Sequence, residues 1–495
     1  MSVIDRIVLY GAGRCCERMC ALLEKADIKI LAIIDSDKNK QGRELAGHII
    51  ESPEDLIKYV DAYLCICIAD PHIVMDIRDM LRKIYHYPTN NIIDYSLFRK
   101  YMNVSIYSHS KKTQRIITLK EKNLNSFKSI VFDCYNGLGL GGIEAWTMDL
   151  CTCLLHNNWK HIHIMTDNND YNISETISGI VDKVALDKKQ LFEEDSFYSV
   201  FQYLLSKVPC IVVTSKPSIT LLAACVLKKA FREEIKIISV IHNGTQETYK
   251  EYLLYKDEID LYIGVSQDIQ RGICQNSVNS AKVLAMTCPF ECEKELLRTY
   301  TTDETLPIKI GYAGRMDGME KSQKRMDLLL QLIELLDRNK VNFQFELAGD
   351  GVAKSAMEKF INVHQLDKKV TFLGQIERSK IKYFWREQDV CVNVADHEGR
   401  SISIIEAMGN GAIPVVTHVS GVSEDIANNE NGFIVPLRDI KTMAERIGYL
   451  SVHRERLRQM GMLAHDIIYP KSLMEPHVKF WEEIFEGYGY NRQSN

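Results

Sequence analysis

The sequence contains no Cys-x-x-Cys pair, no long apolar run and no surplus of basic residues. Its fourteen cysteines lack the spacing of a zinc site, and Cys16, Cys65 and Cys225 lie in apolar stretches where a free thiol packs as a small hydrophobic group. No run approaches the roughly 18 apolar residues that cross a bilayer. A net charge of −5 argues against a nucleic-acid-binding protein, which normally has a basic surface. We therefore expect a reduced, cytoplasmic protein.

The chain is too long, at 495 residues, for one hydrophobic core and predicts about three domains. Short apolar strands alternate with helices in residues 1–100, 128–290 and 306–465, which is the pattern of a buried parallel sheet. A basic linker at 101–127 separates the first two units, and a C-terminal helix is expected within 466–495. The predicted fold class is α/β, with each unit doubly wound.

Three turns of the third unit follow strands, at the sheet edge where ligands of such folds bind. The first places Arg315 and Lys321 after a strand, where two cations suit a diphosphate leaving group, although a solvated basic turn explains them equally well. The second, AGDG at 348–351, is a plain strand-to-helix turn. The third holds Glu398 and Glu406, eight residues apart; Glu406 also fits a helix capping box with Ser403 as N-cap.

Several motifs of the third unit resemble those of family 4 glycosyltransferases, which are retaining enzymes of the two-domain GT-B fold. The family signature E-G-x-G-x-x-x-x-E-A, followed by a G-x-P-V strand, is similar to Glu398–Ala407 and Gly411–Val415. The segment SGVSEDIANNENGFIVP is similar to the family's G-x-x-E…N-G-x-x-V. The likeness covers 306–465 and, more weakly, 128–290. It implies a GT-B fold preceded by an extra Rossmann-like domain, with the acceptor bound by 128–290 and a nucleotide-sugar donor by 306–465.

The resemblance also assigns roles within the third turn. Glu406 would hydrogen-bond the nucleotide ribose, and Glu398 would face the donor sugar. The turn at Gly399 would present the backbone N–H groups of Ser401 and Ile402 to the diphosphate.

The first turn matches the family with one irregularity. Arg315 corresponds to its phosphate-binding arginine. Lys321 corresponds to its lysine but comes one residue late, so Lys324 is a rival. Ser401 stands where the family usually has glycine, and Arg400 where it often has an aromatic residue.

The second unit supplies two further matches. Gly141 and Gly142 are similar to the family's glycine loop, which lies against donor phosphate and acceptor. His242, which ends a strand, matches a histidine near the donor sugar, although such a histidine is more often structural. No carboxylate stands out as a covalent nucleophile, so the resemblance implies front-side substitution with retention, without a metal or a required cofactor.

The first unit carries the layout of a dinucleotide fingerprint, with Gly11 and Gly13 after a strand and Asp35 ending the next strand. Cys16 replaces the third glycine. A nucleotide at this unit is one prediction, and a structural or regulatory domain is the other. Asp35 and Asp37 also spell the D-x-D metal motif of another glycosyltransferase fold, but in this context we assign no metal.

Three classes of function are compared. The leading hypothesis is a retaining transferase of nucleotide-activated sugars onto a glycan, lipid-linked or protein acceptor, in cell-surface polysaccharide or glycoconjugate assembly. The second is a nicotinamide-dependent oxidoreductase or nucleotide-sugar-modifying enzyme, disfavoured because no Tyr-x-x-x-Lys pattern follows the fingerprint. The third, a scaffold without activity, is disfavoured by the intact Arg315, Glu398 and Glu406.

The charge of the linker bears on whether the protein contacts a membrane. Residues 99–128 hold eight basic residues and one acidic residue. Such a run is usually a solvated surface. The alternative is peripheral contact with the inner face of the cell membrane, near a lipid-linked acceptor.

Overall fold

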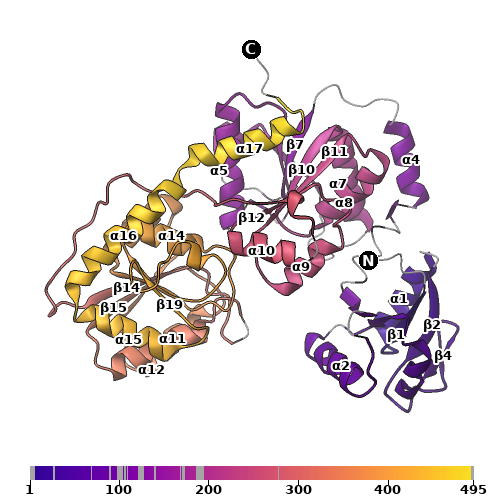
Figure 1. The fold of residues 1–495 in the computed structure, drawn as a ribbon, viewed down its shortest axis with the longest axis horizontal. Helices are drawn as coiled ribbons and strands as arrows, with labels where there is room; N and C mark the ends of the chain where they lie inside the picture. Colours follow the sequence, from indigo (N-terminus) through magenta and orange to yellow (C-terminus); the bar gives the residue numbers. More distant parts are fainter. Residues whose placement is uncertain are drawn as a thin grey trace.

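Three parallel sheets follow one another along the chain, each flanked by helices (Figure 1). The computed structural model describes residues 6–491 except 26–27, 69, 89–90, 97, 99–103, 105–106, 109, 121–127, 136, 139–140, 168, 170–172, 186–193, 277 and 321. The predicted α/β class is therefore confirmed. We name the bodies around the three sheets the first, second and third unit, in chain order.

The first unit has the strand order β3-β4-β2-β1-β5-β6, parallel except for the β3–β4 hairpin. Its elements are β1 (Arg6–Tyr10), α1 (Arg14–Lys25), β2 (Lys29–Ile34), β3 (Glu44–Leu45), β4 (His48–Glu51), η1 (Pro53–Tyr59), β5 (Tyr63–Ile66), α2 (Pro71–Lys83) and β6 (Ile92–Asp94). Alternate residues of β1 enter two apolar clusters, one on each face of the sheet. The strand is thus buried from both sides, as its continuous apolar sequence predicts.

The second unit has the parallel order β13-β12-β11-β10-β7-β8-β9. Its strands are β7 (Ser129–Cys134), β8 (Ile162–Thr166), β9 (Val181–Lys183), β10 (Cys210–Thr214), β11 (Ile235–Ile241), β12 (Leu261–Gly264) and β13 (Val283–Ala285). Its helices are α5 (Gly142–His156), α6 (Glu175–Ser178), α7 (Glu194–Lys207), α8 (Ile219–Ala230), α9 (Gln246–Leu253), α10 (Gln267–Gln275) and η3 (Ser280–Lys282). Strand β7 is buried along its whole length, so this unit forms around it.

The third unit has the parallel order β16-β15-β14-β17-β18-β19. Its strands are β14 (Ile308–Ala313), β15 (Phe343–Ala348), β16 (Val370–Gly374), β17 (Val390–Asn393), β18 (Ile413–Thr417) and β19 (Phe433–Val435). Its helices are α11 (Met326–Arg338), α12 (Lys354–Val363), η4 (Arg378–Lys380), α13 (Ile381–Glu387), α14 (Ile402–Gly409), η5 (Val422–Glu424), α15 (Ile440–Ser451) and α16 (Arg454–Ser472). Leu329, Leu332 and Leu336 are fully buried, which explains why α11 has helical apolar spacing.

Part of the basic linker is a helix that packs on the second unit. Helix α4 (Lys111–Lys120) buries Thr113 and Ile117, and the hydroxyls of Ser110 and Tyr198 lie 2.9 Å apart. Over these residues the segment is an ordered element of the second unit rather than a plain tether. Lys111, Lys112 and Arg115 lie on its exposed side.

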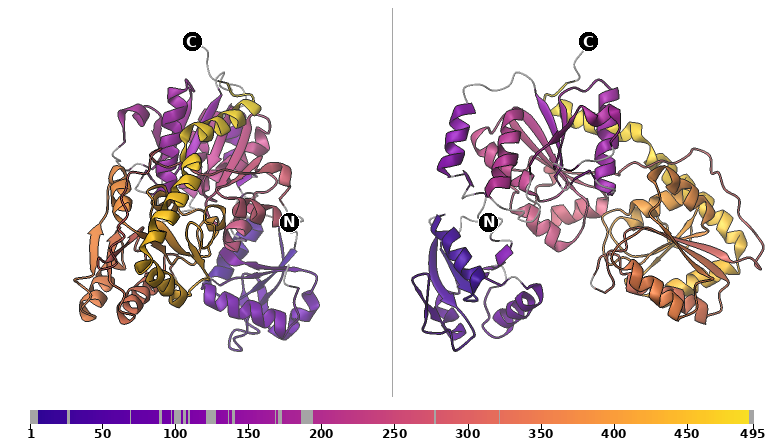
Figure 2. Two further views of the ribbon diagram at one scale, coloured as in Figure 1. Left: turned by 60° about the vertical axis from the view of Figure 1, so that its left-hand side comes forward. Right: turned by 180° about the vertical axis from the view of Figure 1, so that it is seen from behind.

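The C-terminal helix α17 (Met474–Gly487) leaves the third unit and runs back over the second (Figures 1 and 2). Val478, Trp481 and Phe485 are buried in the core of the second unit, and Phe480 is partly buried beside it. This chain crossing ties the two units together. Within the described part of the chain, no helix combines the length and the apolar character needed to cross a membrane.

Candidate active site

The second and third units meet at the carboxyl ends of their strands. In the third sheet the strand order reverses between β14 and β17, and in the second between β7 and β10. Turns that follow strands at such switch points form the ligand crevice of doubly wound folds. Arg315 follows β14, Glu398 follows β17, and Gly141 follows β7. The fold therefore brings the turns that hold Arg315, Glu398 and Gly141 to the facing edges of the two sheets, and we call the space between them the cleft.

Direct contacts across the cleft join these turns. A Cβ atom on Gly399 would lie 1.9 Å from the carbonyl oxygen of His242, so only glycine allows this approach. Gly141 is the N-cap of α5, and a Cβ atom on Gly142 would lie 3.9 Å from Cγ1 of Ile402. The glycine loop of the second unit thus faces the start of α14.

Polar contacts between the units flank the cleft on both sides. Asp149 on α5 pairs with Arg378 of the third unit at 2.5 Å. On the other side, the Gly421 N–H donates to Asp268 at 2.9 Å, and the Asp268 N–H donates to Glu424 at 3.0 Å. These ion-pair and hydrogen-bond contacts hold the two units facing one another, and the candidate site lies between them.

Glu398 is buried and lies at the centre of a hydrogen-bond cluster. Lys324 Nζ pairs with Glu398 Oε1 at 2.5 Å, and the side-chain amides of Gln323 and Asn393 donate to the same carboxylate at 3.3 and 3.4 Å. The sequence left Lys321 and Lys324 as rivals. Lys324 lies in the site, whereas Lys321 lies outside the described residues. The pairing of Lys324 with Glu398 could not have been predicted, because 74 residues separate the two in the sequence.

Arg315 extends from the turn after β14, with 69% of its side chain exposed. Its ion-pair partner is the adjacent Asp317, at 3.3 Å. The AGDG turn packs closely against the turn that holds Arg315. A Cβ atom on Gly349 would lie 1.9 Å from the carbonyl oxygen of Gly314. The second turn therefore has a packing role, and the Arg315 guanidinium keeps the reach to meet an anion in the cleft.

Glu406 is not part of a capping box. Helix α14 begins at Ile402 with Ser401 as its N-cap, so Ser403 is already inside the helix and the capping interpretation is wrong. Ser401 makes no side-chain cap bond, and no other described side chain accepts from the first N–H groups of α14, which leaves them available to an anion. Burial raises the pKa of Glu406 to about 7, and no described residue donates a hydrogen bond to its carboxylate. An unpaired carboxylate in this position suits a hydroxyl-bearing ligand.

His242 has a neutral imidazole with an unused nitrogen. Burial, reinforced by the nearby charge of Lys216, lowers the pKa of His242 to about 3. Its Nε2 atom is buried without a hydrogen-bond partner among the described residues. Buried polar atoms are normally paired, so this nitrogen marks a place where a ligand hydroxyl could bind.

The fingerprint of the first unit is arranged differently. The N–H of Ala12, within the glycine turn between Gly11 and Gly13, donates to the Asp35 carboxylate at 2.7 Å, and Lys40 pairs with the same group at 2.9 Å. Burial alone would raise the pKa of Asp35, but the Asp37 N–H, Lys40 and the Ala12 N–H outweigh it and lower the pKa below its usual value. Both carboxylate oxygens thus have partners inside the chain. The described residues contain no cluster of three or more metal-ligating side chains.

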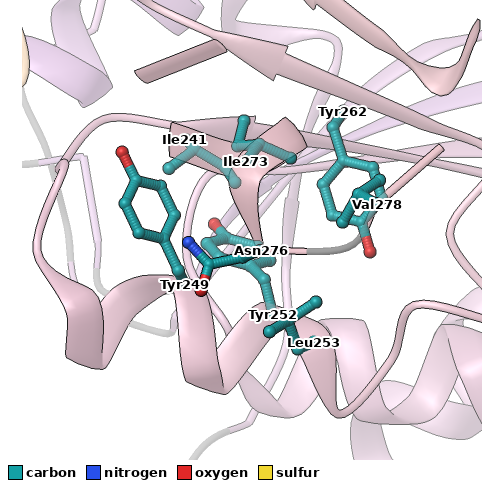
Figure 3. Close-up of a pocket in the computed structure, with 8 residues that line it drawn as sticks. All are labelled: Ile241, Tyr249, Tyr252, Leu253, Tyr262, Ile273, Asn276 and Val278. Carbon is teal, nitrogen blue, oxygen red and sulfur yellow. The ribbon is translucent and has the colours of Figure 1, made fainter. Parts of the chain in front are cut away.

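Two cavities lie near the cleft without containing its charged residues. Figure 3 shows a small pocket inside the second unit, with a volume of about 10 Å³, enough for about one water. Its lining is mostly apolar and aromatic, so we assign no substrate to it. A larger cavity, about 290 Å³, lies where α17 leaves the third unit and is bordered by Thr287, Lys471 and His477.

The comparisons with known proteins concern the third unit, the first unit and the fold. The family model described as "Glycosyl transferases group 1" matches residues 307–452, and the model "C2185-like, N-terminal" matches residues 3–93. A poly(ribitol-phosphate) alpha-N-acetylglucosaminyltransferase of Staphylococcus aureus is 27% identical over 177 residues, 36% of this chain and 35% of that protein. An N-acetyl-alpha-D-glucosaminyl L-malate synthase of Bacillus anthracis is 21% identical over 58% of this chain and 81% of its own length.

Among solved structures, Anabaena HepE in complex with UDP superposes with a TM-score of 0.58 and 16% identity, covering 73% of this chain and all of that one. At this identity the likeness establishes the fold, and the predicted GT-B architecture is confirmed. The chain therefore has the GT-B fold, and residues 307–452 match the glycosyl transferases group 1 domain.

Proposed function

We propose that the protein is a retaining, metal-independent glycosyltransferase that uses a nucleoside-diphosphate sugar. The observation that carries the proposal is the meeting of exposed Arg315, the Lys324–Glu398 pair and the uncapped start of α14 at one strand-end cleft. Positive charge and free N–H groups at this point stabilise a departing diphosphate. A UDP-activated sugar is the donor we favour, because HepE was solved with UDP.

The reaction consists of positioning and charge stabilisation. The acceptor hydroxyl attacks the anomeric carbon on the face from which the diphosphate leaves. The bond between that carbon and the phosphate oxygen breaks, and the acceptor proton passes to the departing phosphate. Glu406 holds the ribose, and His242 Nε2 and Glu398 face the sugar. No step needs a cofactor from the protein.

The acceptor is a glycan, a lipid-linked sugar or a protein in cell-surface polysaccharide or glycoconjugate assembly. The name of the Staphylococcus relative, a transferase to poly(ribitol phosphate), supports a glycoconjugate product. Binding of UDP and a panel of UDP-sugars to the full chain, measured by calorimetry, tests the donor, and the anomeric configuration of the product tests retention. Failure of every nucleotide sugar to bind would refute the proposal.

Metal independence has its own test. The cations of the cleft, Arg315 and Lys324, take the role that a divalent ion has in other transferases. We expect UDP release from the donor to continue at full rate in excess EDTA. Loss of turnover in EDTA with recovery on adding Mn²⁺ would overturn the assignment.

We propose that α4 rests on an anionic membrane surface. Its inner side packs on the second unit, and Lys111 and Arg115 are exposed on its outer side, while the ammonium of Lys112, also exposed, lies over the Tyr198 ring at 3.7 Å. Each such cation near anionic lipid contributes about 1 kcal/mol, which gives salt-sensitive peripheral binding.

Vesicle flotation tests the membrane contact. The wild-type chain should float with anionic vesicles at low salt, not with neutral ones, and the triple change of Lys111, Lys112 and Arg115 to Gln should weaken flotation. Exposed Arg338, Lys359 and Lys368 of the third unit, changed to Gln together, form the matched control and should leave flotation unchanged. Equal loss in both triple variants would mean that net charge, not α4, decides binding.

A nucleotide at the first unit is a separate proposal, supported by the glycine turn at the switch point between β1 and β5. Calorimetry with NAD on the Arg315→Ala, Glu406→Gln double variant tests it, because the third-unit site is weakened there and NAD is not its proposed ligand. Binding of one equivalent would locate a nucleotide at the first unit. No binding would leave that unit a structural or regulatory domain.

A further inference from the structure

Trp146 on α5 lies between the His242 ring and helix α17. Its ring centre is 5.7 Å from that of His242, with the planes at 65°, and 6.2 Å from that of His477. Trp481 of α17 lies 5.8 Å away on the same indole. Only 5% of Trp146 is exposed, so its neighbours fix where the indole lies.

One hydrogen bond orients the indole. Trp146 Nε1–H donates to His477 Nε2 at 2.9 Å. Because Nε2 accepts, the proton of the neutral His477 ring is on Nδ1, which lies 3.2 Å from the carbonyl oxygen of Thr287. Burial lowers the pKa of His477 to about 4, so the ring stays neutral at physiological pH. Rotating the indole would leave a buried N–H without a partner.

The His242 ring depends on this arrangement. Its Nε2 has no hydrogen-bond partner among the described residues, so packing rather than a bond sets the angle of the ring. Its backbone carbonyl is already held against Gly399. Among the described residues, the His242 ring packs edge-to-face against one aromatic side chain, that of Trp146.

We propose that His477 is a positioning residue for the active site, acting through Trp146 on His242. The bond from the indole to His477 fixes the Trp146 ring, which holds the His242 imidazole with Nε2 toward the donor sugar. This inference rests on the proposed function of the cleft. It gives α17 a second role, because the helix that ties the two units together also sets the geometry of a residue in the cleft.

The same helix offers a matched control. Trp159 Nε1–H donates to Glu482 Oε1 at 3.0 Å, a bond of the same kind between the second unit and α17. Trp159 contacts Phe485, and no contact with His242 is described for it. Breaking this bond should loosen α17 to a similar degree while leaving the His242 ring in place.

A spectrum of the histidine rings tests the inference without any substrate. In the full chain labelled with ¹⁵N-histidine, the His242 signal is identified by its absence in His242→Asn. We expect it to shift in His477→Leu and in Trp146→Phe, to return in His477→Gln, whose amide oxygen can accept the indole N–H, and to stay in place in Glu482→Leu and Trp159→Phe.

Turnover gives a second readout. With UDP as the probe, the dissociation constant should be unchanged in His477→Leu, because the charged side chains proposed to bind the diphosphate, Arg315 and Lys324, belong to the third unit. The kcat for UDP release from a UDP-sugar should fall by up to about a hundredfold, the cost of a small misplacement of a reacting group. His477→Gln should recover most of it.

The two proposals fail in different ways. If no UDP-sugar is turned over, the proposed function fails while the ring spectrum still decides the role of His477. An unmoved His242 signal in His477→Leu overturns the inference even in an active enzyme. Equal movement in Glu482→Leu overturns it as well, since general loosening of α17 would then explain the effect. If His477→Leu or Glu482→Leu fails to fold, the comparison of Trp146→Phe with Trp159→Phe tests the inference instead.

Discussion

The first and third units use the same local design in opposite ways. Each has a strand, a glycine-containing turn and a helix at the switch point of a doubly wound sheet, with an acidic residue nearby. In the first unit the Asp35 carboxylate accepts hydrogen bonds from the Ala12 N–H, the Asp37 N–H and Lys40, so both of its oxygens have partners within the chain. In the third unit the Glu406 carboxylate has no described donor, and burial raises its pKa to about 7.

In the first unit the acidic side chain finds its hydrogen-bond partners within the chain, whereas in the third unit it is left open to the ligand that we propose. A buried polar group without a partner is costly, so proteins keep such groups chiefly where function requires them. His242 Nε2 is such a buried atom, and neither the Glu406 carboxylate nor the first N–H groups of α14 have a side-chain partner among the described residues. Hydrogen-bond satisfaction therefore distinguishes these two sites better than the motif does.

Removing the cations of the third unit should give the largest effect. Arg315→Ala, and separately Lys324→Ala, should lower kcat by about a hundredfold or more, as the loss of an oxyanion donor does. Arg315 is exposed, so its variant should keep the wild-type Tm. Full activity in the folded Arg315→Ala variant would contradict the phosphate assignment. Lys359→Ala, at an exposed position of helix α12, is the control that should change nothing.

Changing the unpaired carboxylate should give a smaller effect with a distinct pH signature. Glu406→Gln should weaken UDP binding by about tenfold, because hydrogen bonds to charged groups contribute about 1.5–3 kcal/mol. Wild-type affinity for UDP should fall as pH drops through about 7, where Glu406 gains its proton. The Gln variant should lose this pH dependence, which calorimetry between pH 6 and 8.5 measures.

The stability of the same variant should change in the opposite direction. A raised pKa means that the folded state holds the proton where the unfolded state has released it, so ionisation of Glu406 lowers stability as pH rises toward 7. Glu406→Gln should therefore melt higher than wild type at pH 8 and alike at pH 4. A lower Tm at pH 8 would mean that the carboxylate has a structural partner.

Much of this architecture could be predicted from the sequence, because buried parallel strands leave continuous apolar runs such as those of β7 and β10. The turns with Glu398 and Arg315 were also predictable, since they follow strands. The Lys324–Glu398 pair and the Trp146–His477 bond were not, because residues 74 and 331 positions apart meet only when the fold is complete. No spacing in the sequence indicates such a contact. Ser401 was missed as the N-cap of α14 because Ser403 and Glu406 imitate a capping box.

The smallest effect on turnover should come from the first unit. Asp35→Ala leaves the N–H groups of Ala12 and Asp37 without their acceptor, and an unpaired buried donor costs about 1–3 kcal/mol. The lowered pKa of Asp35 implies that its contribution is present above the usual carboxyl range and is lost as pH falls through its folded pKa. Hydrogen exchange of the amides in β1, α1 and β2 should therefore accelerate at pH 7 in the variant, while kcat for UDP release stays at the wild-type value.

Asp37→Ala is the control and should exchange like wild type, because it removes an exposed carboxylate that bonds only the Asn39 N–H in the described residues. Faster exchange without loss of turnover would show that Asp35 closes a structural turn. Loss of turnover in a folded variant would instead connect the first unit to catalysis and remove the contrast between the two sites.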